Sequence, residues 1–371
     1  MHKKGKGKIS RYTNTENLNI TYLFGAGASY NSVPIWNKQG ETMRIVARHI
    51  NSAISRNKTG KETLHNNPII KELIAKLEFY SLKAVEFGTL DIYAKSLFLL
   101  DSKKELNDLK YHLSVYFDIW ENFVGKLEVI DEVKSVKYTD IDKRYYSLLS
   151  VLLNKGNANP VLNSNVSFIS WNYDLQLEMA YKSFIHDSSK QTLEYVNHFF
   201  KFFDREEKND VVHLNGFRGY FNYKNKLYPN VDNNSRASIE DYLLGVIENT
   251  EQFKIKRQID YSNNIKYAWE NNFETLKPAI DILEKTNVLI IIGYSFPSYN
   301  RKVDSKLITS LGKKAINQEV KQIIYQNPNR TNIDLIKNIS GLEPSYIDDK
   351  SQFHIPHEFL FPQKAADMFF G

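Results

Sequence analysis

The chain has 371 residues, of which 42% are hydrophobic and 13% aromatic, and its formal net charge at pH 7 is +6. This composition is typical of a packed globular protein and excludes an intrinsically disordered chain. Because the chain has no cysteine, disulfides, a thiolate nucleophile and cysteine-ligated zinc are excluded, which fits a cytoplasmic protein.

Part of the positive charge lies at the N-terminus, where glycines alternate with Lys3, Lys4, Lys6, Lys8 and Arg11. We expect residues 1–19 to form a basic flexible tail, and a contact with nucleic acid or a partner is the alternative. Because no apolar segment follows the tail, we expect that it is not a signal peptide. The run Val288–Ile292 is far shorter than the roughly 18 residues that a membrane span needs. We therefore expect no membrane contact, and contact with nucleic acid only indirectly.

The first predicted strand, residues 20–24, is an apolar run that ends in Gly25, Ala26 and Gly27, with Ser29 close behind. Two glycines let the backbone turn sharply and approach a ligand, and helix amides just beyond could face a phosphate. The loop lacks the third glycine of GxGxxG and the Lys-Ser/Thr pair of a P-loop. A plain tight turn between strand and helix is therefore the alternative.

Residues 41–155 have a helical pattern. Apolar side chains recur at steps of three to four residues, as in Tyr116, Ile119, Trp120 and Phe123, which form one face of a helix. The stretch contains no chemical motif. We expect a helical subdomain inserted after the first strand.

The next strand pattern, Val166–Trp171, is followed by Asn172 and Asp174 and then by a predicted helix over 175–184. An asparagine offers both a donor and an acceptor. An aspartate in this place can hold a ribose hydroxyl or cap the next helix, and both alternatives stay open.

His213 ends a short strand that begins at Val211, with Gly216 close behind. A histidine at the carboxyl end of a strand is well placed to accept a proton, although a structural histidine is the alternative. Residues 216–265 are polar, aromatic and irregular, with one helix near 238–249, and form a second predicted insertion.

The last part of the chain contains the most apolar strand. An amphipathic helix over 269–283 leads into the strand 287–292, whose continuous apolar run predicts a central parallel strand. Gly293 lets this strand end close on a ligand, and the Ser295 hydroxyl can bind phosphate. Asn327 follows a further strand at 320–325 and could hold an adenosine ribose.

These strand–turn–helix units predict an α/β fold, a Rossmann-like parallel sheet with helices on both faces and an inserted helical subdomain. The domain is expected to span 20–330, with insertions at about 41–155 and 216–265 and a C-terminal extension, 331–371, packed on it. Ligands bind such sheets at the carboxyl ends of the strands. Since every polar motif follows a strand, we expect one shared site.

The order of the motifs resembles that of the sirtuin family. The motifs are GAGxS, then NxD, then a strand-end histidine about 40 residues later, and finally GxS after a hydrophobic strand. This series is most similar to that of the sirtuin-like NADase domains of bacterial anti-phage defence proteins. The resemblance spans roughly residues 20–330, with long unmatched helical insertions.

The resemblance implies roles for ten residues. Gly25, Ala26, Gly27 and Ser29 would contact the NAD diphosphate, and Asn172 and Asp174 would line the nicotinamide pocket. His213 would be the base for the ribose hydroxyls. Gly293 and Ser295 would contact the phosphate and ribose, and Asn327 would contact the adenosine ribose. Asn172 and His213 would be the catalytic residues. No metal is implied.

Three departures from the protein deacylases favour plain hydrolysis of NAD+. The zinc ribbon is missing, Val33-Pro34-Ile35-Trp36-Asn37 stands in place of an Ile-Pro-Asp-Phe-Arg stretch, and no peptide-binding segment is recognisable. NAD+ is thus expected as a substrate, cleaved to nicotinamide and ADP-ribose. The alternatives are a module that binds NAD or ADP-ribose without turnover, and a sirtuin-type deacylase or ADP-ribosyltransferase.

An unrestrained NADase would kill its host, so the activity must be gated. The resemblance implies an abortive-infection effector controlled by homo-oligomerisation or by a protein partner encoded nearby, such as a hexameric ATPase/helicase or an Argonaute-type protein.

Overall fold

The computed structural model describes residues 18–56, 62–124, 128–130, 135–186, 192–203, 210–223, 226–232, 237–256, 261–271, 273–312 and 321–347. The predicted basic tail lies outside these residues, apart from Leu18 and Asn19. The part of the predicted C-terminal extension from residue 348 onward also lies outside them.

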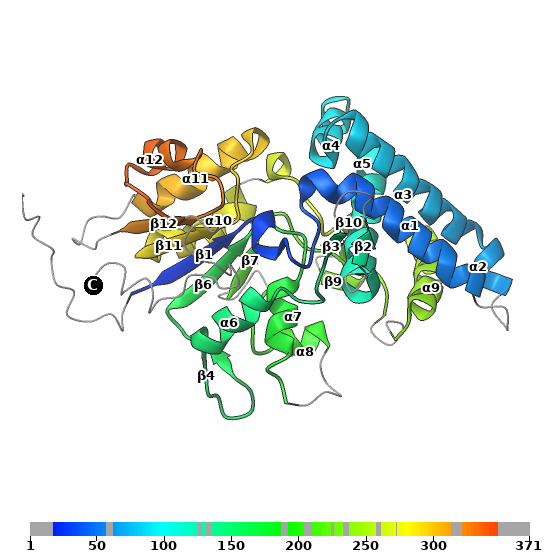
Figure 1. Ribbon diagram of the computed structural model, residues 1–371, viewed down its shortest axis with the longest axis horizontal. Helices are drawn as coiled ribbons and strands as arrows, with labels where there is room; N and C mark the ends of the chain where they lie inside the picture. The colour runs from blue at the N-terminus through cyan, green and yellow to red at the C-terminus, as the bar shows by residue number, and fades with distance from the viewer. Residues whose placement is uncertain are drawn as a thin grey trace, which may run out of the picture.

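The centre of the fold is a six-stranded sheet in which every pair of neighbouring strands is parallel (Figure 1). Its strands, in chain order, are β1 (Ile20–Phe24), β6 (Val166–Ser170), β7 (Val211–His213), β11 (Val288–Ile292), β12 (Gln322–Gln326) and β13 (Ser345–Ile347). Their order in space is β7-β6-β1-β11-β12-β13. Counted within the sheet this is 3-2-1-4-5-6, the order of dinucleotide-binding folds. The predicted α/β Rossmann-like fold is confirmed.

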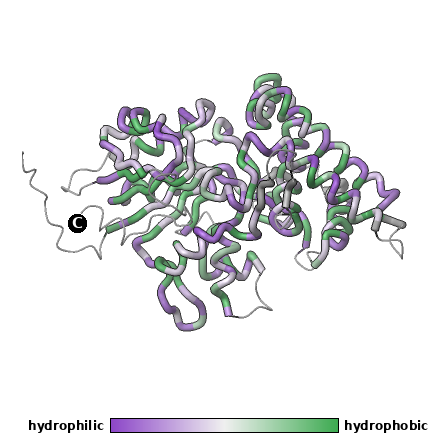
Figure 2. The backbone as a smooth tube through the Cα atoms, viewed as in Figure 1, coloured by the Kyte–Doolittle hydropathy of each residue, from purple (hydrophilic) through white to green (hydrophobic). Residues whose placement is uncertain are grey.

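The central strands are buried on both faces, which explains their unbroken apolar sequence. In β1, Tyr22 and Phe24 pack into one hydrophobic core, whereas Leu23 packs into a core on the opposite face. The hydrophobic colouring of Figure 2 follows these strands. Phe24 is paired with Ser170 on one side and Ile292 on the other, so the three strands end level with one another.

Helices cover both faces of the sheet, as predicted, and among the described residues there are three on each face (Figure 1). On the face of Tyr22 they are α6 (Lys143–Leu152), α7 (Gln176–Lys182) and α8 (Leu193–Asn197). On the face of Leu23 they are α10 (Phe273–Lys285), α11 (Arg301–Gly312) and α12 (Ile333–Ser340). Helix α6 lies within the stretch expected to be inserted, yet its Tyr145 and Leu148 pack in the sheet core.

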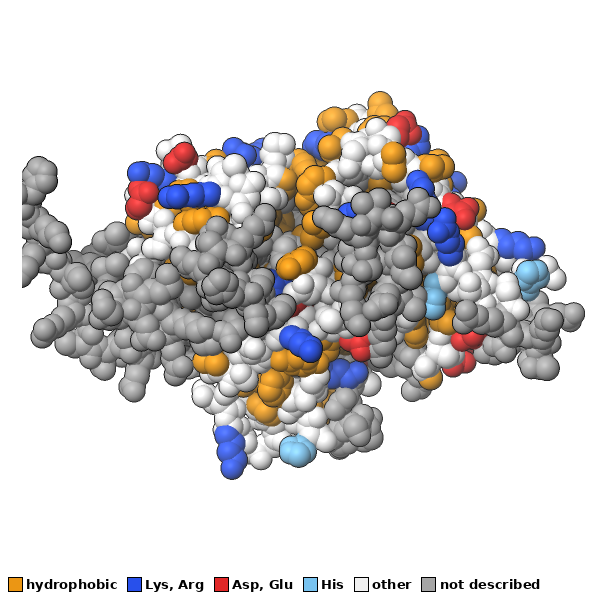
Figure 3. Space-filling model, in the orientation of Figure 1, with side chains coloured by type: hydrophobic (Ala, Val, Ile, Leu, Met, Phe, Trp, Pro, Cys, Tyr) orange, Lys and Arg blue, Asp and Glu red, His pale blue; other side chains and the backbone are white. Residues whose placement is uncertain are grey.

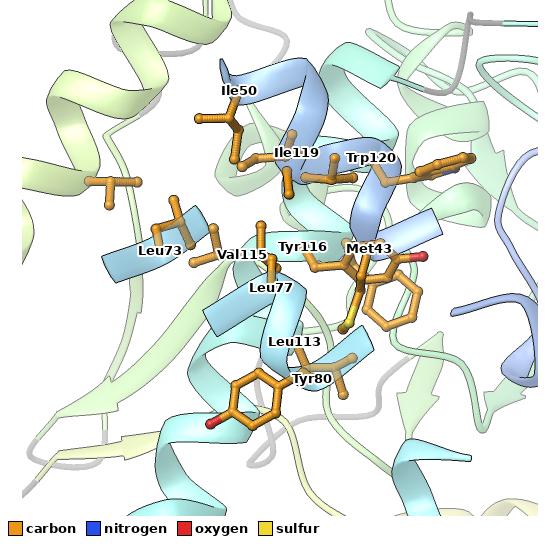
Figure 4. Packing of buried hydrophobic residues seen from close by; sticks show 14 of the residues in the cluster. Met43, Ile50, Leu73, Leu77, Tyr80, Leu113, Val115, Tyr116, Ile119 and Trp120 are labelled. Carbon is orange, nitrogen blue, oxygen red and sulfur yellow. The ribbon is translucent and has the colours of Figure 1, made fainter. Parts of the chain in front are cut away.

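The second lobe consists of helices with a core of their own. Its elements are α1 (Gln39–Arg56), α2 (Glu62–Asn66), α3 (Pro68–Glu86), α4 (Leu90–Leu99), α5 (Lys103–Ile119) and a π-helical turn, Trp120–Val124. Figure 4 shows Met43 and Ile50 of α1 packed with Leu77 of α3 and Tyr116 of α5. Helix α9 (Ile239–Lys256) enters the same core through side chains that include Tyr242. The two predicted insertions thus build one lobe.

Several short strands complete the described part of the chain. An antiparallel sheet of β8 (Tyr220–Tyr223), β9 (Lys226–Pro229) and β10 (Tyr261–Asn263) lies where we expected irregular backbone around one helix. Two further hairpins are β2 (Glu128–Ile130) with β3 (Ser135–Lys137) and β4 (Leu153–Asn154) with β5 (Val161–Leu162). All these strands have four residues or fewer, too few for a clear alternation of polar and apolar side chains.

Two boundaries differ from the expectation. The sheet domain continues past residue 330, because α12 covers it and β13 pairs with β12 as its edge strand. Helix α10 begins at Phe273, four residues after Trp269, because Asn271 has extended backbone, with ψ near 131°. Trp269 lies instead in a 3-10 turn, Ala268–Glu270.

Part of the helical lobe has an apolar surface. Hydrophobic side chains gather over α4 in Figure 3, and its Ile92, Phe98 and Leu99 are 46%, 43% and 71% exposed. Of the helices described, none is long and apolar enough to cross a membrane.

Candidate functional site

The loops after β1 and β11 meet through glycines. Gly27 N donates to Gly293 O at 2.9 Å. A Cβ atom on Gly27 would lie 2.8 Å from the Gly293 Cα, and a Cβ on Gly25 would lie 2.5 Å from the Tyr294 Cα. Gly293 also has a φ of +63°, a conformation that favours glycine. Three glycines are therefore required where the order of the strands reverses, the point at which such sheets bind ligands.

A 3-10 turn of four residues, Ala26–Ser29, follows this junction in place of the α-helix that the glycine pattern predicts. Two of its amides are already bonded, Gly27 N to Gly293 O and Ala28 N to Gly25 O. Phosphate binding by the amides of an α-helix directly after β1 is thus not available here.

A cavity of about 260 Å³ lies at the carboxyl ends of the strands. Seven of the ten predicted site residues line it, namely Ala26, Gly27, Asn172, Asp174, Gly293, Ser295 and Asn327. They follow β1, β6, β11 and β12, so the parallel register brings together motifs that lie far apart in the sequence. Gly25, Ser29 and His213 do not line the cavity.

Ser29 lies behind the wall of the cavity and connects two residues that form it. Its buried hydroxyl donates to Asp174 Oδ1 at 3.1 Å and accepts from Asn172 Nδ2 at 3.4 Å. The Tyr145 hydroxyl of α6 lies 2.9 Å from the hydroxyl oxygen of Ser29. Ser29 therefore holds Asn172 and Asp174 in place.

The sequence left open whether Asp174 caps the next helix or faces a ligand, and the structure places it where it can do both. Its Oδ1 accepts from Gln176 N at 3.2 Å, as a cap of α7 does, while the residue also lines the cavity. Burial, helped by the nearby charge of Glu121, raises the pKa of Asp174 to about 7. The carboxyl group therefore titrates near neutral pH.

His213 is hydrogen-bonded to Glu178, a residue that the sequence analysis did not identify. Its Nε2 lies 2.7 Å from Oε1 of Glu178 on α7, and its Nδ1 lies 3.4 Å from the backbone oxygen of Asn172. Burial lowers the pKa of His213, but the charge of Glu178 and its hydrogen bond outweigh this and leave the pKa raised.

The side chain of Asn327, which also lines the cavity, is bonded within the protein. Its Nδ2 donates to Tyr294 O at 3.3 Å, and its Oδ1 accepts from Asn329 N at 2.9 Å. Ser295 is exposed at the rim, where its backbone oxygen accepts from Asn332 Nδ2 at 2.9 Å.

An aromatic end of the cavity, made by Trp171, Asn215, Tyr267 and Trp269, was missed at the sequence level. Among the residues that the structure describes, no hydrogen-bond partner is found for one buried polar atom of each of these four residues, namely Trp171 Nε1, Asn215 Oδ1, Tyr267 OH and Trp269 Nε1. Buried polar groups are nearly always bonded, so four such atoms around one cavity indicate a ligand or water. The only sequence signal was that Trp171 and Asn215 stand next to motif residues.

The helical lobe completes the cavity. Asp91 at the start of α4 and Phe117 of α5 line it opposite the sheet. The Tyr299 hydroxyl, from the loop after β11, donates to Asp91 Oδ2 at 3.0 Å. Burial raises the pKa of Asp91 to about 6.

A buried charge cluster joins the two lobes beneath the cavity. The guanidinium of Arg218, 1% exposed, donates to Asp118 of α5 and to Glu121 of the π-helical turn. Glu121 Oε1 also accepts from Gln176 Nε2 at 2.8 Å. The start of α7, and with it Asp174, is thereby fixed to the helical lobe. Within the described residues, no group of three or more His, Asp or Glu side chains could hold a metal ion.

Comparison with known proteins gives matches among solved structures alone. No protein-family model and no curated protein sequence matches the chain. Sir2Tm bound to a propionylated peptide is 10% identical with a TM-score of 0.37, and Sir2 bound to an acetylated peptide is 12% identical with a TM-score of 0.38; each match covers 95% of this chain and 93% of the other.

A third match is Sir2 in complex with an inhibitor, 2'-O-acetyl-ADP-ribose and a deacetylated peptide. It is 11% identical with a TM-score of 0.36 and covers 95% of this chain and 94% of the other. The Rossmann-like fold of the present chain rests on its own strand order and register.

Proposed function

We propose that the protein is an NAD+ hydrolase that cleaves NAD+ to nicotinamide and ADP-ribose. One observation supports this most directly: the cavity at the reversal of strand order is lined both by glycine backbone, at Gly27 and Gly293, and by four residues with unpartnered buried polar atoms among the described part of the chain. A dinucleotide needs both, a surface that its diphosphate can approach closely and polar groups that orient a base.

In this proposal the diphosphate lies along Ala26, Gly27, Gly293 and Ser295, which line the cavity, and the adenosine ribose lies near Asn327. Gly25 and Ser29 would support this loop from outside the cavity lining. The lining at Ala26, Gly27 and Gly293 supports this placement, because these residues have a methyl group or no side chain to keep a diphosphate at a distance from the backbone. The bonds of the Asn327 side chain to Tyr294 and Asn329 must be exchanged for bonds to the ribose hydroxyls.

The nicotinamide would lie toward Asn172 and the aromatic end. A carboxamide has one acceptor and one donor group, and Trp171 Nε1 and Asn215 Oδ1 are a donor and an acceptor without partners. Asn172, held by Ser29, would position the carboxamide and a water near the anomeric carbon.

The reaction breaks the bond between the nicotinamide nitrogen and the ribose. The electron pair of this bond goes to the ring nitrogen, and the ribose becomes positively charged in the transition state. Ionised Asp174 would stabilise this charge, and its pKa of about 7 allows ionisation near neutral pH. The oxygen of water then bonds to the anomeric carbon, and His213 would accept a proton from the water or a ribose hydroxyl.

The test is the release of nicotinamide from NAD+ by the purified protein, followed by chromatography. We expect turnover that requires Asn172. An active protein whose Asn172→Ala variant consumes NAD+ at the wild-type rate would overturn the assignment.

A module that binds NAD or ADP-ribose without turnover is the second candidate. The position of His213 favours it, because that ring does not line the cavity and is bonded to Glu178. If calorimetry detects binding of NAD+ and no nicotinamide is released, the protein is a binding module and not a hydrolase. A deacylase or ADP-ribosyltransferase is the third candidate, and incubation with NAD+ and an acetylated peptide tests it.

We further propose that the enzyme is a cytoplasmic abortive-infection effector in anti-phage defence. Depletion of NAD+ would be lethal, so a homo-oligomer or a partner encoded nearby, such as a hexameric ATPase/helicase or an Argonaute-type protein, would gate it. The contact of Asp91 with Tyr299 supports a gating role for the helical lobe, because this lobe closes the cavity. A fully active monomer in size-exclusion chromatography, unaffected by any neighbouring gene product, would contradict gating.

A further inference from the structure

Glu178 is a buried carboxylate in contact with the candidate site. Its side chain is 1% exposed, its Oε1 meets His213 Nε2 at 2.7 Å, and its Oε2 has no hydrogen-bond partner in the described part of the chain. Burial of an ionised carboxylate is costly unless an opposite charge compensates it. The anion of Glu178 is therefore most stable when His213 carries a positive charge.

The surroundings of His213 agree with that charge. Its two ring nitrogens face acceptors, Glu178 Oε1 and the backbone oxygen of Asn172. An imidazole that donates from both nitrogens is an imidazolium. The charged groups around it are Glu178 of α7 and Asp174 of the loop after β6, both acidic, and the ring of Phe217 packs on it at 5.1 Å.

We infer that Glu178 is a positioning residue that keeps one proton on Nε2 of His213 and leaves Nδ1 as the nitrogen that exchanges protons with the cavity. This inference rests on the proposed hydrolase. The Nε2 bond is short and paired with a buried anion, whereas the Nδ1 contact of 3.4 Å is long and weak. Nδ1 also lies on the side of Asn172, which lines the cavity.

The resulting proton path has a definite order. The Nδ1 proton must first leave to solvent, and Nδ1 then accepts one proton as the oxygen of water bonds to the anomeric carbon and the electron pair of the broken bond goes to nicotinamide. The Nε2 proton stays on the ring throughout. Because the anion of Glu178 favours the imidazolium, it sets the pH at which the first loss occurs.

The first test measures the proton directly. The ring of His213 is titrated by NMR in the wild type and in Glu178→Gln, with the signal assigned through His213→Gln. We expect the pKa of His213 to fall by at least about one unit in E178Q, because the amide has no charge. The control is Glu78→Gln, an exposed position on α3, which should leave the pKa unchanged. An unchanged pKa in E178Q overturns the inference.

The second test uses the reaction. The acidic limb of the pH profile of kcat/KM should move to lower pH in E178Q, and kcat should fall at least about tenfold because the ring loses its orientation. Glu178→Asp keeps the charge and should keep the limb within about half a unit of the wild type. It also serves as the comparison if E178Q does not fold. A tenfold loss without any shift of the limb would indicate a merely structural role and overturn the inference.

The two tests separate the two hypotheses. A wild type that consumes no NAD+ overturns the proposed function and the catalytic part of this inference, while the NMR titration still decides where the protons of His213 lie.

Discussion

The two sides of the cavity are built in different ways. Between β1 and β11 the contact is backbone against backbone, at Gly25, Gly27 and Gly293, with no side chain between the loops. Between the loops after β1 and β6 the contact is a network of side chains, in which Asn172 and Asp174 are held through Ser29. The first side depends on close approach, and the second on hydrogen bonds and charge.

This difference extends to the helical lobe. The network side is connected to that lobe through Gln176, Glu121 and Arg218, so its geometry depends on elements far along the chain. The glycine side depends on the register of two neighbouring strands. Substitutions on the glycine side should therefore act on folding, and those on the network side on chemistry and pH dependence.

The largest expected effect is on the glycine side. Gly293→Ala places a Cβ 2.4 Å from Ala28 N, in a backbone with φ of +63°, and the paired strands leave no room to move. We expect the free energy of unfolding to fall by more than about 3 kcal/mol in urea denaturation. Gly341→Ala is the matched control, since its φ is +71° but nothing lies within 4 Å. It should lose about 1 kcal/mol. Equal losses would refute the close contact as the cause.

Asn172→Ala should have the opposite profile, with a large loss of activity and little loss of stability. Its one side-chain bond, to Ser29 at 3.4 Å, is weak, so the free energy of unfolding should change by less than about 1 kcal/mol. Release of nicotinamide should fall at least about 100-fold. The control is Asn329→Ala, an exposed position outside the cavity lining, which should retain activity. Large destabilisation of Asn172→Ala would remove the contrast between the two sides.

The pH dependence of stability tests Asp174. Its pKa is about 7 in the folded chain against an ordinary 3.8, so its stabilising contribution is complete below about pH 4 and is lost as the pH rises to 7. Asp174→Asn keeps the Oδ1 acceptor but does not titrate. The free energy of unfolding of this variant, minus that of the wild type, should rise between pH 4 and 7 by up to about 1.4 kcal/mol per pH unit. A constant difference would contradict the raised pKa.

The smallest effect concerns the contact between the lobes. Asp91→Asn, Tyr299→Phe and the double variant form a cycle, which should give a coupling energy of about 1 kcal/mol for the 3.0 Å hydrogen bond. Urea denaturation at pH 8 measures it, well above the Asp91 pKa of about 6. A coupling of zero would mean that the lobes meet here without holding each other.

The sequence predicted the central strands well, and the reason is physical. β1, β6, β11 and β12 begin and end within two residues of the expectation, because doubly buried parallel strands are short apolar runs that stop at glycine or a polar residue. β13 was not predicted, since it has three residues and pairs on one side only. Trp269 fitted the helical spacing of α10, but the extended backbone of Asn271 separates it from the helix, which begins at Phe273.

A site residue could be predicted from the sequence where its position directly after a strand is enough to place it in the cavity lining. Residues such as Asn172 and Gly293 line the cavity because they directly follow strands of one parallel sheet. The direction of the His213 side chain was not predictable, because it depends on Glu178, whose contact arises from the packing of α7. Tyr267 was missed for a related reason, since it reaches the cavity from a turn without a motif.

The pairing of β1 with β11 also bears on the synthesis of the chain. Asn19 and Asn287, at the starts of these strands, are hydrogen-bonded across 268 residues. A ribosome that adds roughly 5–20 residues per second needs tens of seconds to make the chain between them. Until then Gly27 has no Gly293 to meet, and the cavity lacks one wall. A fragment that stops before β11 therefore cannot form the complete site, so under the proposed function an unfinished chain would not hydrolyse NAD+.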